Sequence, residues 1–245
     1  MTTQPSFLIV GGGLAGAIAA QTLREEGFDG SITLLGQEPH RPYERPPLSK
    51  DYLQGKADRD SIFAHPEAWY ADHAVELRLG TAVTSLDPAA RTVTTSTGAQ
   101  LGYDKLLLTT GSTPRHLSVP GADLDGVHYL RSVDDSERIK AGFARAHRAA
   151  IIGAGWIGLE TAAAARNAGL EVTLLERSEL GAWSDSDSDK NHVGLDPAPV
   201  AENDTGYRPV FASELGHRSL AAQVDAMITM QVGKDDCGLR AEDAQ

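Results

Sequence analysis

The chain has 245 residues, with 22 Lys+Arg against 34 Asp+Glu and a formal net charge of -12. Such an acidic balance argues against nucleic acid or an anionic membrane as the main partner. The single cysteine, Cys237, excludes an internal disulfide, a dithiol redox centre and a thiolate metal cluster. Because the N-terminus lacks a basic leader and no apolar run approaches the roughly 20 residues that cross a bilayer, we expect a soluble, cytoplasmic protein.

The first forty residues have the pattern of a nucleotide-binding βαβ unit. Phe7–Val10 predicts a strand, residues 17–26 predict a helix, and Ser31–Leu35 predict a second strand. Between the first strand and the helix lies Gly11-x-Gly13-x-x-Gly16, a motif with three separate needs for glycine. The first glycine permits a tight turn, the second lets the backbone approach a diphosphate, and the third lets the helix pack on the strand.

The middle of the chain predicts an irregular loop followed by a hairpin and a strand. Residues 39–56 combine prolines with the cations Arg41, Arg45 and Lys50, which favours a stiff, basic loop. Residues 82–86 and 92–95 predict a hairpin, and 105–110 predict a buried strand that ends at Gly111. A helix is expected over residues 134–146.

A second βαβ pattern follows. Residues 149–152 predict a strand, Gly153-x-Gly155-x-x-Gly158 repeats the glycine motif, and residues 159–167 and 171–175 predict a helix and a strand. Glu176 ends this strand, about 20 residues after the motif, where a carboxylate would bind a ribose 2′-hydroxyl and repel a 2′-phosphate. We therefore expect NADH rather than NADPH, although the neighbouring Arg177 leaves NADPH open because an arginine could bind a phosphate.

Two such motifs in one chain predict transfer between two bound dinucleotides, and FAD with NADH is the obvious pair. The expected fold class is α/β: a Rossmann-like, three-layer FAD/NAD(P)-binding fold with two nested dinucleotide-binding units, the second incomplete. The alternative for each motif is a glycine-rich turn without a ligand.

Four segments of the chain carry a further signal: Ile9–Gly16, Pro42–Lys50, Tyr103–Gly111 and Ile151–Glu160. They resemble the flavoprotein ferredoxin reductases of oxygenase systems, such as putidaredoxin and rubredoxin reductases, within the pyridine nucleotide-disulfide oxidoreductase superfamily. The resemblance covers about residues 6–180, and its most specific segment is Pro42–Lys50.

The resemblance implies roles in binding FAD. The family usually has an acid at the first of two ribose positions, so Gln37 departs from its pattern and Glu38 would have to substitute. Lys50 would lie near flavin N5, paired with Glu160, and this predicted catalytic pair would tune the flavin and position the nicotinamide. The implied FAD positions are Gly11, Gly13, Leu14, Ala15, Gly16, Gln37, Glu38, Arg45, Lys50, Val83, Thr110, Gly111 and Arg131.

The second glycine motif predicts an NADH site. We expect no metal site, because the eight histidines show no ligand-type clustering. The NADH positions are Gly153, Gly155, Trp156, Ile157, Gly158 and Glu176.

Simpler roles compete at several positions. Arg45 and Lys50 could be ordinary solvated charges, and Glu160 an exposed helix residue. Val83 could belong to a strand core, and Trp156 could either stack near nicotinamide or fill a gap in the core.

After residue 180 the family pattern stops, and no Ala-x-Gly-Asp motif follows. We expect a chain truncated or shifted in frame there, with an incomplete FAD-binding domain over 1–147, the start of an NADH-binding domain over 148–180, and a divergent, partly disordered acidic tail over 181–245. The sheet of the second unit should then expose an edge. A helix is possible near residues 220–230.

The predicted function is hydride transfer from NADH to FAD, followed by electron transfer to a ferredoxin or rubredoxin of an oxygenase system. The alternative is an inactive or regulatory nucleotide-binding fragment of such a reductase. A disulfide reductase is disfavoured by the lack of a cysteine pair, and the proline-rich segment gives no support to a flavin monooxygenase.

Overall fold

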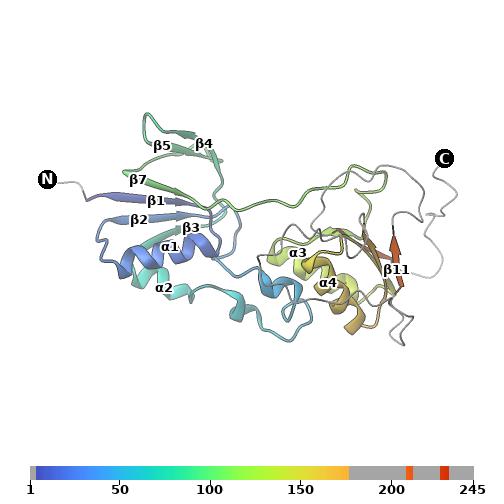
Figure 1. Cartoon of the computed structure of the whole chain (residues 1–245). Coiled ribbons are helices and arrows are strands. Elements are labelled where there is room, and N and C mark those ends of the chain that lie inside the picture. The colour runs from blue at the N-terminus through green and yellow to red at the C-terminus, as the bar shows by residue number, and fades with distance from the viewer. Residues whose placement is uncertain (1–3, 177–207, 212–226, 232–245) are drawn as a thin grey trace, which may run out of the picture. The chain divides into compact units, whose positions relative to one another are not determined.

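The computed structural model describes residues 4–176, 208–211 and 227–231, with side chains described as far as residue 175 (Figure 1). It divides into two compact units: unit 1 is residues 1–45 and 57–113, and unit 2 is residues 46–56 and 114–245. None of the helices in these ranges is long and apolar enough to cross a membrane.

The centre of unit 1 is a parallel sheet in the order β3-β2-β1-β7. All four strands place their carboxyl ends at one edge, where ligands of open α/β sheets bind. The strands are β1 (Ser6–Val10), β2 (Ser31–Leu35), β3 (Val75–Arg78) and β7 (Lys105–Leu108).

Alternation of side chains along the strands gives this sheet two covered faces, and therefore three layers. Helices α1 (Leu14–Glu25) and α2 (Glu67–Asp72) cover one face, with α1 contributing Ala20 and α2 contributing Tyr70 to a core that includes Ile9. The antiparallel strands β4 (Val83–Asp87), β5 (Thr92–Thr95) and β6 (Gln100–Gly102) cover the other face (Figure 1).

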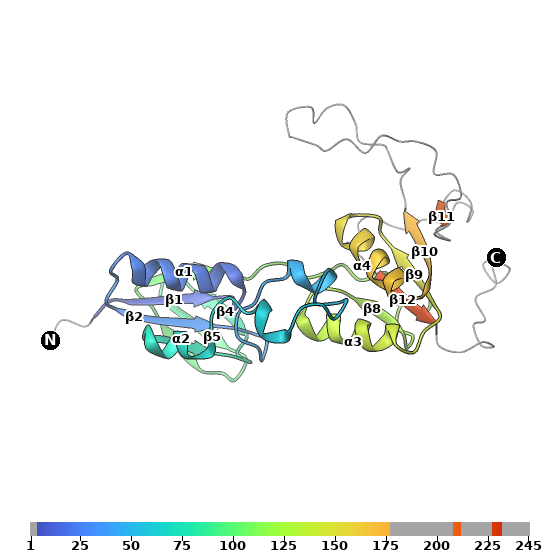
Figure 2. The same ribbon diagram turned by 90° about the horizontal axis from the view of Figure 1, so that it is seen from below.

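Unit 2 is built around a βαβ unit. Helix α4 (Trp156–Asn167) connects β9 (Arg148–Ile152) to the parallel strand β10 (Glu171–Glu176), and packs against both (Figure 2). The complete sheet has the order β11-β10-β9-β12-β8. The other strands of this sheet are β8 (Val127–Tyr129), β11 (Arg208–Phe211) and β12 (Met227–Gln231). Helix α3 (Val133–Phe143) also belongs to unit 2.

Residues 46–56, here called the proline strap, belong to unit 2. The strap begins with the 3-10 helix η1 (Pro46–Ser49), which contacts both α3 and α4. The buried hydroxyl of Ser136 on α3 donates to the carbonyl oxygen of Leu48 at 2.8 Å. A second 3-10 helix, η2 (Arg59–Ile62), lies in unit 1.

The three-layer α/β class is confirmed, and so are the strands and helices of both predicted βαβ patterns. Helix α1 begins at Leu14 rather than at residue 17 and α4 at Trp156 rather than at 159, so both start inside the glycine motifs. The compact units divide near residue 113, and the division of functional domains at 147 stays a prediction.

Two expectations are wrong. Residues 227–231 form a strand, β12, rather than part of a helix. The strand at 105–108 is only half-buried, because within the described residues β7 pairs on one side alone, with β1. In unit 2, β11 pairs with β10 and β12 with β9, so the edges of the described sheet are β11 and β8 rather than β10 and β9. The other expectations for residues 181–245 fall outside the described part.

Candidate dinucleotide-binding sites

The first glycine motif forms the turn between β1 and α1 in unit 1. Gly11 has φ of 125°, and a Cβ there would lie 2.1 Å from the carbonyl oxygen of Thr109, so only glycine fits. Thr109 also donates its hydroxyl to the carbonyl oxygen of Gly11 at 3.0 Å. The turn is therefore fixed from the end of the neighbouring strand β7.

Gly16 and Gly13 differ in the space available for a side chain. A Cβ on Gly16 would lie 2.3 Å from the carbonyl oxygen of Gly11, which shows how closely α1 packs on the turn. At Gly13, with an ordinary φ of -94°, a Cβ would meet none of the described atoms within 4 Å. The space beside Gly13 is open, and Leu14 and Ala15, which follow it at the start of α1, are exposed. A diphosphate fits such a space, since the first amides of a helix favour anions.

The second motif repeats these relations in unit 2. A Cβ on Gly158 would lie 1.9 Å from the carbonyl oxygen of Gly153, whereas Gly155 has φ of -69° and no described atom within 4 Å of its Cβ position. The amide of Gly153 donates to the carbonyl oxygen of Leu175 at 2.8 Å, as that of Gly11 donates to Leu35 at 2.9 Å. Both turns thus combine one tight helix contact with one open position.

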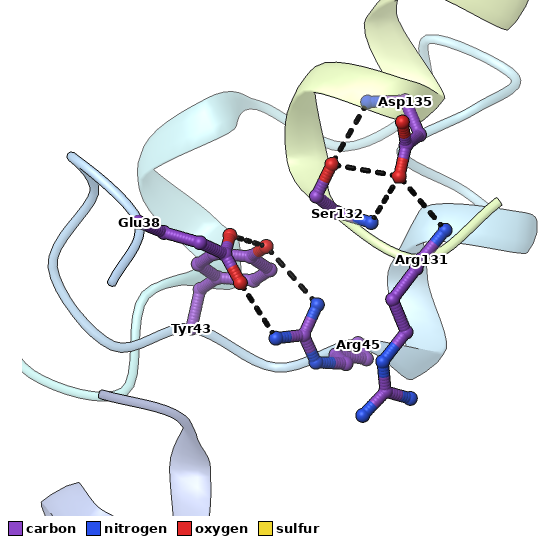
Figure 3. A network of polar contacts seen from close by, with 6 residues as sticks. All are labelled: Glu38, Tyr43, Arg45, Arg131, Ser132 and Asp135. Atoms are coloured by element: carbon purple, nitrogen blue, oxygen red, sulfur yellow. Dashed lines mark hydrogen bonds and ion pairs between the residues drawn. The ribbon is translucent and has the colours of Figure 1, made fainter. Parts of the chain in front are cut away.

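Glu38 takes part in a polar network with Tyr43 and Arg45, all in unit 1 (Figure 3). Arg45 Nη2 donates to Glu38 Oε1 at 2.8 Å, the Tyr43 hydroxyl donates to Glu38 Oε2, and Arg45 Nη1 donates to the Tyr43 oxygen at 3.2 Å. Burial opposes the charge of Arg45, but its contacts with Glu38 and Tyr43 raise its pKa above the usual value. The guanidinium is therefore held in place, and the simpler role of Arg45 as a solvated charge does not fit.

This network bears on recognition of the adenosine ribose. Each carboxylate oxygen of Glu38 already accepts a hydrogen bond, whereas Gln37 beside it is exposed. An exposed amide can both donate to and accept from ribose hydroxyls. Glu38 therefore fixes Arg45, and the ribose-binding roles of Gln37 and Glu38 stay predictions.

Lys50 and Glu160, the predicted catalytic pair, form an ion pair within unit 2. Lys50 Nζ lies 3.3 Å from Glu160 Oε1, with the two side chains 52% and 26% exposed. Glu160 Oε2 accepts a hydrogen bond from the Ser49 hydroxyl at 2.5 Å. Glu160 is therefore a partnered residue of α4, and its simpler role as an exposed helix residue does not fit.

Arg131 precedes a capping box at the start of α3. The carboxylate of Asp135 accepts from the backbone amides of Arg131 and Ser132 at 3.1 and 2.7 Å, and the Ser132 hydroxyl caps the amide of Asp135 (Figure 3). This box fixes the backbone at Arg131.

The remaining predicted positions differ in character. Thr110 and Gly111 are exposed just beyond β7, at the same sheet edge as the first motif. Val83 is half-buried against the core of Leu8, Val10, Leu35 and Val93, so it contributes to the packing of its strand. Contact with the flavin stays a prediction. Glu176 ends β10 as expected, and its side chain is outside the described part.

Trp156 is the first residue of α4, and its side chain is 76% exposed. Filling a gap in the core is thereby excluded, and stacking near nicotinamide stays a prediction. Ile157 beside it is also exposed. Among the residues with described side chains, no group of three His, Cys, Asp or Glu could hold a metal ion.

Sequence reasoning missed three supporting residues: Tyr43, Thr109 and Ser49. Tyr43 and Ser49 lie inside the segment that carried the resemblance, and Thr109 precedes the predicted position Thr110. Their contacts join residues distant in sequence or in an irregular loop, so residue spacing gave no signal for them.

Two α/β units, each with a glycine turn that opens onto the start of a helix, define a dinucleotide-binding protein. The family model described as pyridine nucleotide-disulphide oxidoreductase matches residues 5–188, and the chain belongs to this family.

Similar proteins include ferredoxin reductases. The chain is 47% identical to rhodocoxin reductase of Rhodococcus erythropolis over 171 residues, which are 70% of the chain and 40% of that protein. It is 39% identical to a chain of the covalent putidaredoxin reductase–putidaredoxin complex, with a TM-score of 0.68 over 71% of this chain and 42% of that one. It is 41% identical to a ferredoxin reductase from Rhodopseudomonas palustris, with a TM-score of 0.69 over 71% of this chain and 43% of that one. The chain thus spans less than half the length of these relatives.

Proposed function

We propose that this chain binds FAD and NADH and serves as the dinucleotide-binding part of a ferredoxin reductase. The observation that carries this proposal is the open space beside Gly13, repeated beside Gly155, where each helix begins without a capping side chain. When bound, NADH supplies a hydride that FAD accepts, and the flavin passes the two electrons singly to a ferredoxin or rubredoxin.

The proposal assigns the diphosphate and adenosine of FAD to unit 1, through the first motif, Gln37 and the Arg45 network. NADH is assigned to unit 2 through Gly153–Gly158 and Trp156. Lys50, Glu160, Val83, Thr110, Gly111 and Arg131 are proposed flavin contacts, and Glu176 the residue that selects NADH over NADPH.

The roles of the chain's own side chains follow from their charges. Lys50, paired with Glu160, keeps a positive charge in place without leaving it uncompensated, which suits a group that tunes electron density rather than one that transfers a proton. Arg45 is held so that its charge can meet an anionic group. A ferredoxin-type partner is proposed from the relatives named above, and a cytoplasmic location stays a prediction.

Absorbance of the reconstituted chain tests the proposal. After incubation with FAD and desalting, the chain should retain flavin absorbance, and NADH should bleach it under argon. A colourless chain would exclude the enzyme function and favour the second candidate, an inactive or regulatory nucleotide-binding fragment. Flavin that is retained but not bleached would show one working site instead of two.

A further inference from the structure

Ser49 is a buried polar residue to which the sequence assigned no role. It ends η1 in the proline strap and is only 5% exposed. Its hydroxyl lies 2.5 Å from Glu160 Oε2 and 3.4 Å from the carbonyl oxygen of Pro46. Because a serine hydroxyl has one proton, the much shorter contact identifies the Glu160 carboxylate as its acceptor.

The two oxygens of Glu160 have different partners. Oε2 accepts from Ser49, and Oε1 faces Lys50 Nζ at 3.3 Å. The terminal torsion of a glutamate is broad, so a lone ion pair would not fix the orientation of the carboxylate. The hydrogen bond from a buried donor supplies this constraint, and it directs Oε1 toward Lys50.

The strap does not depend on Ser49 for its attachment to unit 2. Ser136 donates to the Leu48 carbonyl oxygen at 2.8 Å, the Tyr52 hydroxyl donates to Glu137 at 2.7 Å, and Asn167 donates to Gln54 at 3.0 Å. Removal of the Ser49 hydroxyl should therefore change the Glu160 carboxylate while the strap stays in place.

We propose that Ser49 is a positioning residue: it orients the Glu160 carboxylate so that Lys50 is held at the proposed flavin. The part of this inference that concerns the flavin rests on the proposed function. Without Ser49 the half-exposed Lys50 would spend more time away from Glu160, and the positive charge would no longer be presented in one place.

Acylation of lysines by a succinimidyl ester, read by mass spectrometry on the unliganded chain, tests this role. Only a free amine is acylated, and a carboxylate that accepts from the ammonium group disfavours its release as free amine. Lys50 should therefore react slowly relative to the exposed Lys56 and Lys105 of the same chain. Ser49→Ala should raise the relative rate at Lys50 about three- to fivefold, as expected for loss of a partly exposed ion pair. Ser49→Thr, which keeps the hydroxyl, should restore the slow rate.

Two further variants separate positioning from a structural effect. Ser136→Ala removes another buried serine that holds the strap, and should leave the rate at Lys50 within about twofold of the parent. Glu160→Gln should raise the rate at least as much as Ser49→Ala, and the double variant should show no added effect, because both changes break one network.

The proposal is overturned if Ser49→Ala leaves Lys50 slow, if Ser136→Ala accelerates it equally, or if the effects of Ser49→Ala and Glu160→Gln simply multiply. Should Ser49→Ala not fold, Ser49→Thr and Ser49→Cys replace it, with a slow and a fast rate expected respectively. The acylation measurement uses no nucleotide. A failure of the chain to bind FAD would therefore reject the proposed function without changing the acylation result for Ser49.

Discussion

At the scale of single residues, the two open glycine positions offer the sharpest test. Gly13 and Gly155 have backbone angles that alanine adopts, and a methyl group there meets no described atom. Gly13→Ala should therefore fold normally but weaken FAD binding at least about tenfold, because the methyl group occupies the space proposed for the diphosphate. Flavin fluorescence measures this affinity.

Gly155→Ala is the matched variant in unit 2. It should weaken NADH binding by a similar factor and leave FAD binding unchanged, while Gly13→Ala should do the reverse. Equal losses of both ligands in either variant would contradict the assignment of one diphosphate to each glycine motif.

Gly16 gives the opposite expectation for stability. Since a Cβ there would lie 2.3 Å from the Gly11 carbonyl oxygen, Gly16→Ala should lower the free energy of unfolding by about 1–3 kcal/mol through overpacking. Thermal melting compares it with Gly13→Ala, for which little change is expected. Equal melting temperatures for the two variants would contradict the close packing of α1 on the turn.

His65 should make stability depend on pH. Its ring is buried in unit 1 and stacked on Trp69 with 4.0 Å between ring centroids, and burial lowers its pKa below 6.5. The unfolded chain therefore binds a proton at His65 more readily than the folded chain does. The contribution of the neutral ring to the free energy of unfolding should be fully present above pH 6.5 and be lost as the pH falls toward the lowered pKa. Melting temperatures between pH 5 and 8 should show this decline.

His65→Phe should reduce the decline without abolishing it, because burial also lowers the pKa of His128 in unit 2. His73→Phe is the comparison variant, since His73 stacks on the same Trp69 but is exposed. It should change the decline less than His65→Phe does, because the charge of His73 lowers the pKa of His65 less than burial does. An unchanged pH profile in His65→Phe would show that this ring does not titrate with unfolding.

At the scale of elements, α3 depends on its capping box. The Ser132 hydroxyl caps the amide of Asp135, and the Asp135 carboxylate accepts from the amide of Ser132. Ser132→Ala should cost about 1 kcal/mol of stability, measured by urea unfolding, whereas Ser132→Thr should cost less because threonine also caps. Equal midpoints for the two variants would contradict the role of the box.

The elements that the sequence predicted correctly are those with strong local patterns. β1, β2, β9 and β10 are apolar runs, and the glycine motifs fix the starts of α1 and α4. α2, β3 and β8 were not predicted, because each is short and depends on packing against the rest of its unit. The sequence leaves a helix possible near residues 220–230, but pairing of β12 with β8 and β9 makes residues 227–231 a strand.

The candidate site was predictable to a similar degree. Spacing alone gave the two glycine turns, and the family resemblance gave Lys50, Arg45 and Glu160, whose pairing and network the structure contains. The partners Ser49, Tyr43 and Thr109 were not predictable, because their positions depend on how the strap, the loop and β7 pack.

At the scale of the whole molecule, the last quarter of the chain contributes to unit 2. β12 pairs with all five residues of β9, and β11 pairs with β10. A chain that ends at residue 176 should therefore show faster hydrogen exchange at β9 amides, while β1 in unit 1 serves as an unchanged internal control. Unaltered protection of β9 would show that β12 contributes nothing to stability.

The central claim is that one chain holds two separate dinucleotide sites. Calorimetric titration of the chain with FAD, followed by titration of the FAD-loaded chain with NADH, tests it most directly. We expect one FAD and one NADH per chain, each binding without displacing the other. Binding of neither nucleotide, of only one, or competition of both for a single site would contradict the claim.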